Sequence, residues 1–263
     1  MRFAVCLFSV LSLTADPPTD VVPADRIQAS LERMMQRNKD KDLLLYTRRQ
    51  QKRELTADGK VEKQTILTLR RDPWDELVVT RVIAKDDKPL PADQQAKQEE
   101  RLRKQIETIR RTPPQSKLEE YSFLREVPSA LLFRRNGSEI HNGRPCDIIT
   151  FEPRPGYKAK QTRAKLFEKI RGQICFDQTD GEVAKINALV FDNVNLGFGL
   201  LGKIDKGTQF EMDRKKWDIG VWFEQWQRIR FDVRIMMVKN IRQEIETNWS
   251  NLNFHPRSQE ANR

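Results

Sequence analysis

The stretch RIRFDVRIMM, residues 228–237, decides the fold because apolar and charged residues alternate along most of it. Apolar side chains stand at every second position from Ile229 to Met237, and arginines and an aspartate fill most of the positions between them. Such alternation is typical of a β-strand with one dry face and one wet face. Residues 241–249 and 204–213 repeat the pattern. We therefore expect a large curved antiparallel sheet whose dry face is covered by helices, by another sheet or by a ligand.

The composition predicts a single, heavily solvated domain. The chain has 263 residues, of which 38% are hydrophobic and 33% charged, and 48 basic against 38 acidic residues give a net charge of +10. Acidic residues are interspersed among the basic ones, whereas a nucleic-acid binder concentrates its positive charge, so no nucleic acid is expected as a partner. The most basic segment, residues 154–171, fits either an anionic membrane surface or a solvated loop.

The N-terminus has the pattern of a secretory signal. A nearly continuous apolar run from Phe3 to Leu13 follows Met1-Arg2 and precedes small residues. The run is too short to span a bilayer and predicts a signal peptide over residues 1–15, and the alternative is a buried N-terminal strand. We expect an exported protein that is soluble once the signal is removed.

The expected export bears on the oxidation state of the cysteines. Cys6 lies in the signal, which leaves Cys146 and Cys175 on two predicted strands. In an oxidising compartment these two could pair in a disulfide, and the alternative is two unpaired buried thiols. No CxxC spacing occurs, and nothing in the sequence places His141 or His255, both expected to be exposed, near the thiols. No metal site is therefore predicted.

Periodicity and turn signals predict the remaining elements. An amphipathic helix is expected over residues 23–35 and a charged helical insertion over residues 91–126. The insertion has only a narrow apolar stripe of Leu102, Ile106 and Ile109, so we interpret it as a mobile cover over the sheet. The other predicted elements are a short helix over 164–170 and strands over 43–55, 61–69, 76–83, 130–135, 146–152, 173–177, 183–190, 204–213, 217–226, 229–237 and 241–249.

Several motifs resemble secreted proteins of the LolA-like (lipoprotein-localisation factor) superfamily. They are NGRPCDII at 142–149 with Glu152-Pro153 after it, IRGQICFD at 170–177 with DGEV at 180–183, and NWSNLNF at 248–254. The resemblance covers residues 22–254 and leaves 255–263 as a polar tail. It implies an α+β fold, a strongly curved antiparallel sheet that forms an open, incomplete β-barrel with helices covering its concave face. It also implies a bacterial periplasmic location, and it carries over no catalytic residue.

The function expected from the resemblance is a periplasmic carrier or binding protein for lipid or lipoprotein acyl chains. The alternative is an interaction or regulatory module that binds an envelope protein through the same fold. Motifs of hydrolases, metalloproteases and nucleotide-binding proteins are absent, so neither catalysis nor a cofactor is expected, and a monomer is assumed. The residues expected to contact the ligand, for which simple core packing is the alternative, are Met34, Met35, Ile204, Phe210, Met212, Ile229, Phe231, Val233, Ile235 and Met237.

Overall fold

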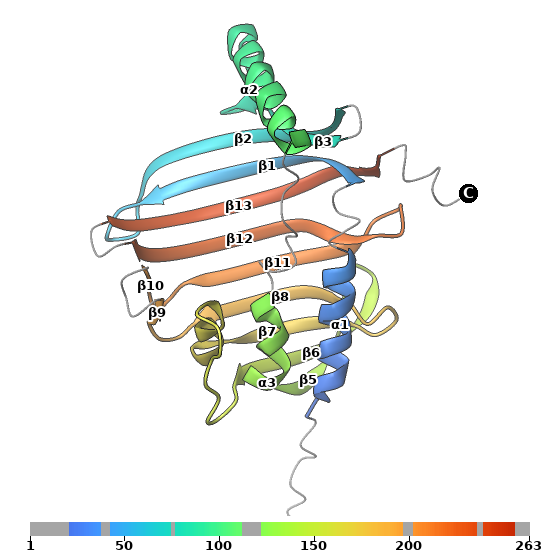
Figure 1. Cartoon of the computed structure of the whole chain (residues 1–263). Helices are drawn as coiled ribbons and strands as arrows, with labels where there is room; N and C mark the ends of the chain where they lie inside the picture. Colours follow the sequence, from blue (N-terminus) through green and yellow to red (C-terminus); the bar gives the residue numbers. More distant parts are fainter. Residues whose placement is uncertain are drawn as a thin grey trace, which may run out of the picture.

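A computed structural model describes residues 21–37, 43–74, 77–111, 122–196, 202–235 and 239–255. Its main feature is one 13-stranded antiparallel sheet in the order β4-β3-β2-β1-β13-β12-β11-β8-β7-β6-β5, with β10 paired to β12 and β9 to β10 (Figure 1). Because the described order begins at β4 and ends at β5, the sheet is open, as predicted. The strands are β1 (Leu44–Leu55), β2 (Val61–Trp74), β3 (Leu77–Lys85), β4 (Lys88–Pro89), β5 (Leu131–His141), β6 (Arg144–Pro153), β7 (Ile170–Asp177), β8 (Val183–Val190), β9 (Val194–Leu196), β10 (Gly202–Ile204), β11 (Gln209–Lys216), β12 (Trp222–Ile235) and β13 (Lys239–Phe254).

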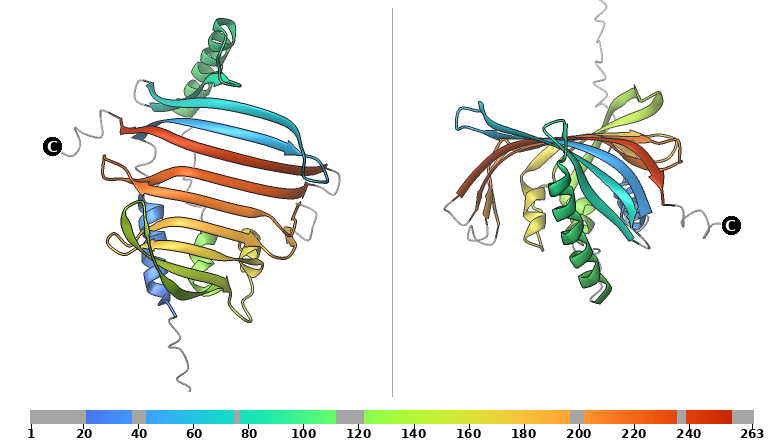
Figure 2. Two further views of the ribbon diagram at one scale, coloured as in Figure 1. Left: turned by 180° about the vertical axis from the view of Figure 1, so that it is seen from behind. Right: turned by 90° about the horizontal axis from the view of Figure 1, so that it is seen from above.

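The sheet is arched, and the helices lie on its inner side (Figure 2, right). They are α1 (Ala24–Arg37), α2 (Ala92–Arg111), η2 (Ser122–Glu126), α3 (Val127–Ala130) and η3 (Arg163–Glu168). We call the inner side the concave face and the outer side the convex face. All of these helices except α2 gather over the β5–β8 half of the sheet (Figure 1).

The main core lies between these helices and the β5–β8 half. Ile27 of α1, Phe167 of η3 and Ala130 of α3 are buried in one cluster with Ile149 of β6 and Phe176 of β7. The apolar face of α1 and the odd positions of β6 supply this cluster, as their periodicities require. Helices therefore cover one half of the concave face, and the expectation that they cover all of it is not shown.

Helix α2 contacts the sheet at the β3 edge and projects beyond it (Figures 1 and 2). The side-chain amide of Gln98 accepts a hydrogen bond from the Val82 backbone N–H at 2.8 Å and donates one to the Val82 carbonyl at 3.0 Å. The Gln98 side chain thus pairs with the part of the β3 edge that the two-residue strand β4 does not cover. Ile106 is 5% exposed and Leu102 half-buried, while the Ile109 side chain lies outside the described residues. Of the helices described, none combines the length and apolarity that a membrane span requires.

Several element boundaries differ from the prediction, and three of these differences change how strands and turns are divided. The segment 217–226 is no separate strand, because a turn at 217–221 precedes β12, which then runs unbroken from Trp222 to Ile235. The segment 204–213 is divided by a turn at residues 205–208. The strand expected to end at Arg135 continues to His141 through an irregularity between Arg135 and Ser138, so Asn136-Gly137 forms no hairpin turn.

Candidate functional site

An apolar ladder crosses the concave face where no described helix packs on it. The strand register pairs Phe210 with Ile229 and Ile229 with Ile245, and it pairs Ile204 with Val233 and Val233 with Ile241. Phe210 also packs against the main core, which lies on the concave face. Because side chains paired across a sheet share a face, the whole row lies on the concave face. We call this set the concave ladder: Ile204, Phe210, Met212, Ile229, Phe231, Val233, Ile241 and Ile245.

The ladder is only partly covered by the protein itself. Met212 is buried at 9% exposure, and the other seven side chains are intermediate. One end is closed by an aromatic cluster in which the ring of Phe223 lies 5.5 Å from that of Tyr46 and 6.2 Å from that of Trp249. A row of partly buried apolar side chains on a curved face is a surface that an apolar ligand could cover.

The structure brings together six of the ten residues expected from the sequence. Met34 and Met35 are half-buried on α1, which packs against the β5–β8 half, and neither belongs to the ladder. Ile235 pairs with Lys239 at the strand end, but its side chain is not described, and Met237 lies outside the described residues. Ile241 and Ile245 were missed as contact residues, although their alternation along the last strand was the signal that could have found them.

A polar row on β1 borders the ladder. Through the register, Arg48 lies between Trp249 and Leu69, and Lys52 lies between Ile245 and Thr65. The Nε atom of Arg48 is buried and has no hydrogen-bond partner in the described part of the chain. The concave face is therefore amphiphilic, with its apolar part on β11–β13 and basic groups on β1.

A hollow of about 470 Å³ lies on the opposite, convex face. Arg134, Glu152, Arg171 and Glu211 are among its lining residues, and two ion pairs, Arg134–Glu152 and Arg228–Glu211, border it. The hollow lies on the face opposite the concave ladder and has four charged side chains in its lining, so it is not the predicted ligand cavity.

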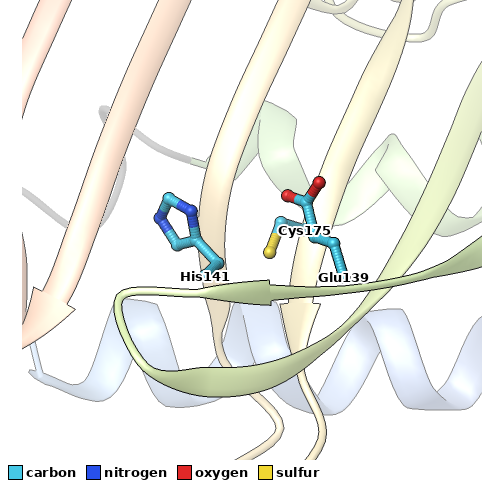
Figure 3. Close-up of side chains that lie close together, drawn as sticks. All are labelled: Glu139, His141 and Cys175. Atoms are coloured by element: carbon cyan, nitrogen blue, oxygen red, sulfur yellow. The ribbon is translucent and has the colours of Figure 1, made fainter.

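The convex face holds the two cysteines. Cys146 and Cys175 form a disulfide with their Cα atoms 5.6 Å apart, and Trp222 is buried beside them. The tip of the β5–β6 hairpin folds over this position, because His141 Nε2 lies 2.8 Å from Asp213 Oδ1 on β11. Figure 3 shows His141 and Glu139 beside Cys175.

The expectation that both histidines are exposed is wrong. The His141 side chain is 14% exposed, since it is held between the hairpin tip and β11. His255 is 5% exposed, and its backbone N–H donates to the Leu43 carbonyl at 2.8 Å. No local pattern in the sequence indicates that His141 lies near Cys175, because this proximity depends on how the hairpin folds back over the sheet.

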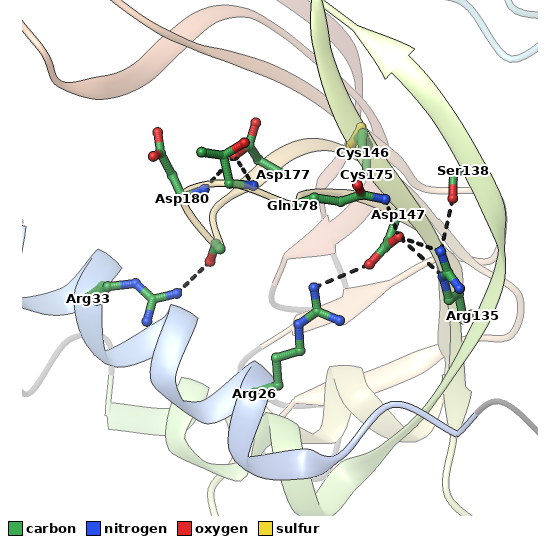
Figure 4. A network of polar contacts seen from close by, with 12 residues as sticks. Arg26, Arg33, Arg135, Ser138, Cys146, Asp147, Cys175, Asp177, Gln178 and Asp180 are labelled. Carbon is green, nitrogen blue, oxygen red and sulfur yellow. Dashed lines mark hydrogen bonds and ion pairs between the residues drawn. A yellow bond between two sulfur atoms is a disulfide. The ribbon is translucent and has the colours of Figure 1, made fainter.

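Two arginines fasten α1 to the sheet (Figure 4). Arg26 donates to Asp147 at 3.2 Å, and its guanidinium lies 4.7 Å from the centre of the Phe176 ring. Arg33 donates to the Gly181 carbonyl at 2.5 Å and to Glu182 at 3.3 Å. The two arginines lie about two turns apart on α1, and both contact segments at the same end of strands β6–β8. The helix is therefore attached to the sheet at two points along its length.

Buried charges continue this network below the helix. Glu182 is fully buried, and the 3% exposed side chain of Arg214 lies 3.5 Å from it. Arg214 also donates to the carbonyls of Val183 and Trp222 at 2.9 and 3.1 Å. A buried charge requires such pairing and hydrogen bonding, so the network orders the end of the sheet on which α1 rests.

Two aspartates in the same region have lowered pKa values. Burial opposes ionisation of Asp147, but hydrogen bonds from Gln178 and Arg135 and the nearby charges outweigh it and lower its pKa. Asp177 is likewise buried, and the bidentate contact of Arg144, at 2.6 and 2.9 Å, lowers its pKa. Both carboxylates therefore stay ionised as structural anchors at neutral pH.

Comparison with known proteins finds distant similarity to solved structures. No protein-family model matches the chain, and no curated protein matches it. A DUF1329 family protein from Desulfovibrio piger is similar over 89% of this chain and 94% of its own, at 14% identity and a TM-score of 0.33. A putative outer membrane lipoprotein-sorting protein domain from Vibrio parahaemolyticus is similar over 87% and 93%, at 11% identity and a TM-score of 0.34. A chain of the Pseudomonas aeruginosa MucA/MucB complex is similar over 86% and 92%, at 11% identity and a TM-score of 0.26.

With identities of 11–14% and TM-scores of 0.26–0.34, these neighbours decide neither the family nor the ligand of this chain. What the concave face binds has to be inferred from its own side chains.

Proposed function

We propose that this protein is an exported, non-catalytic carrier that binds a hydrophobic ligand, the acyl chains of a lipid or a lipoprotein, on its concave face. The observation that carries the proposal is the concave ladder, whose side chains are aligned across four strands and, except for the buried Met212, are only partly buried. An acyl chain lying along the ladder would displace water from both surfaces. This would contribute about 0.8 kcal/mol of binding free energy for each buried methylene.

Further features support export and a cover over the ligand. The signal-like residues 1–15 and the Cys146–Cys175 disulfide both favour an oxidising compartment such as the periplasm. Helix α1, together with α3, η2 and η3, covers the β5–β8 half of the concave face, and α2 lies at the other edge on the same side (Figure 2). In the proposal these two helices border the ligand, and the basic groups of β1 face any anionic part of it.

The test is binding of an acyl chain that carries an environment-sensitive fluorophore. Val233→Trp adds bulk on the concave ladder, and we expect it to weaken binding by at least about tenfold, which corresponds to about 1.4 kcal/mol. Arg230→Trp is the matched control, because Arg230 is exposed on the other face of the same strand and should bind the probe like the wild type.

Equal, saturable binding by both variants would refute the assignment of this face. Absence of probe binding together with specific capture of an envelope protein would favour the alternative, a periplasmic interaction module. Circular dichroism and melting temperatures of both variants separate loss of binding from loss of folding.

A further inference from the structure

Four potential metal ligands converge where the β5–β6 hairpin tip folds over the convex face. One ligand atom each of Glu139, His141 and Cys175 lies within 4.8 Å of the other two (Figure 3). Cys146 is joined to Cys175, and Glu139 is its direct neighbour across the β5–β6 register. One carboxylate, one imidazole and two sulfur atoms are thus collected from three adjacent strands.

The histidine is already oriented as in a metal site. Its Nε2 atom lies 2.8 Å from Asp213 Oδ1, which leaves Nδ1 available on the other side of the ring. Histidine ligands of metals are commonly held in this way by a carboxylate on the second nitrogen, which fixes the tautomer. Glu139 is exposed, and its carboxylate forms no hydrogen bond or ion pair with another described residue. Its carboxylate is therefore available as well.

The two sulfur atoms decide when the site can form. In the disulfide they are poor ligands, because metals bind the thiolate. A tetrahedral zinc ion with Zn–S bonds of about 2.3 Å holds two sulfurs about 3.8 Å apart. The Cα separation of 5.6 Å is compatible with that spacing through side-chain rotation alone. Two thiolates, one imidazole and one carboxylate are a set that favours Zn²⁺ over Mg²⁺ or Ca²⁺.

We propose that reduction of the Cys146–Cys175 disulfide creates a zinc site formed by Glu139, His141, Cys146 and Cys175, with Asp213 as the positioning residue of His141. A dithiol carries out the reduction by exchange: its own two sulfurs become a disulfide, and its two protons and the two electrons pass to the cysteines, which become thiols. Binding of the ion to both thiolates releases those two protons. The ion then links β5, β6 and β7, whereas the disulfide links only β6 and β7.

The test uses Co²⁺ as a spectroscopic substitute for Zn²⁺. The full chain carrying Cys6→Ser is reduced with a dithiol, freed of the dithiol under anaerobic conditions, and titrated with Co²⁺. We expect the visible bands of tetrahedral cobalt together with a thiolate charge-transfer band, saturation at a single ion per chain, and displacement by Zn²⁺. The oxidised chain should show neither band.

Variants assign the ligands. Asp213→Asn keeps the shape of the positioning side chain and should weaken Zn²⁺ binding by about 10- to 100-fold. His141→Ala and Glu139→Gln should weaken it at least as much. Glu62→Gln is the matched control, because Glu62 is an exposed strand glutamate on β2 and should leave the affinity unchanged.

Three results would overturn the proposal: no cobalt bands in the reduced chain, equal binding by the oxidised chain, or an affinity insensitive to both His141→Ala and Glu139→Gln. If His141→Ala does not fold, as judged by circular dichroism, the conservative variants Asp213→Asn and Glu139→Gln still decide the question. None of these outcomes depends on whether the concave face binds acyl chains.

Discussion

Arg33 of α1 lies 3.3 Å from Glu182, and this ion pair joins a side chain that is 37% exposed to one that is fully buried. Glu182 also faces the buried Arg214 from the other side, at 3.5 Å. One carboxylate thus balances two guanidinium groups, one of them out of reach of water. The consequences of removing each partner should differ strongly.

Glu182→Ala should destabilise the protein by about 3–5 kcal/mol, because it leaves Arg214 buried without its counter-charge. Arg33→Gln should cost no more than about 1 kcal/mol, since water can replace much of what the exposed guanidinium supplies. Urea unfolding of both variants measures the difference. Similar losses for the two would show that the buried charge of Arg214 is not what makes Glu182 important.

Stability should fall in acid because of Asp147 and Asp177. Their pKa values are lowered in the folded state despite burial, by Gln178 and Arg135 for Asp147 and by Arg144 for Asp177. The unfolded chain therefore binds protons at a higher pH than the folded chain. The stability that these two carboxylates contribute is fully present above their unfolded pKa of about 3.9. It is lost as the pH falls through their lower pKa values in the folded state.

Asp147→Asn should make the loss of stability in acid less steep, because the amide does not titrate. It should also lower stability at neutral pH, because the contacts with Arg26 and Arg135 are lost. The free energy of unfolding, measured between about pH 2 and pH 6, checks both effects. Asp218→Asn is the control, since Asp218 is exposed in a turn. If the stability of Asp147→Asn falls as steeply in acid as that of the wild type, Asp147 is not a source of the pH dependence.

Local patterns predicted the strands well but not how they fold over one another. The alternation of residues 229–249 depends only on which side chains are apolar, so it predicted the second half of β12, most of β13 and the face that carries Ile229 and Val233. The contact between His141 and Asp213 depends on the curvature of a hairpin across several strands, which no local pattern encodes. The same holds for Glu182, whose burial follows from the packing of α1 over a turn and not from its neighbours in the sequence.

The disulfide should contribute stability without affecting acyl binding. It links residues separated by 29 positions, for which loop closure in the unfolded chain predicts about 3–4 kcal/mol. Cys146 and Cys175 lie on the convex face, opposite Ile149 and Ile174 of the main core. Replacing both by Ser should lower the melting temperature and leave probe affinity per folded molecule unchanged. A large loss of affinity in fully folded protein would place the cysteines in the ligand site.

Helix α2 should open before the long strands do. The sequence predicted a mobile cover here, and the hydrogen bonds described between α2 and the sheet are those of Gln98 with the Val82 backbone. Local opening is favoured where few contacts hold an element. Hydrogen exchange should therefore be faster in residues 92–111 than in β12 and β13. Equal protection would make α2 a fixed structural element and not a cover.

Gln98→Ala tests the attachment itself. The Val82 amide loses its acceptor in this variant, so its hydrogen exchange should accelerate strongly, and α2 should exchange faster as a unit. Gln94→Ala is the matched control, because Gln94 lies one turn earlier, is exposed, and uses only its backbone N–H in the contact with Pro91. If the Val82 amide exchanges at the same rate in both variants, the side-chain amide of Gln98 does not protect the β3 edge. If it accelerates only in Gln98→Ala, a single side chain both closes that edge and anchors the helix.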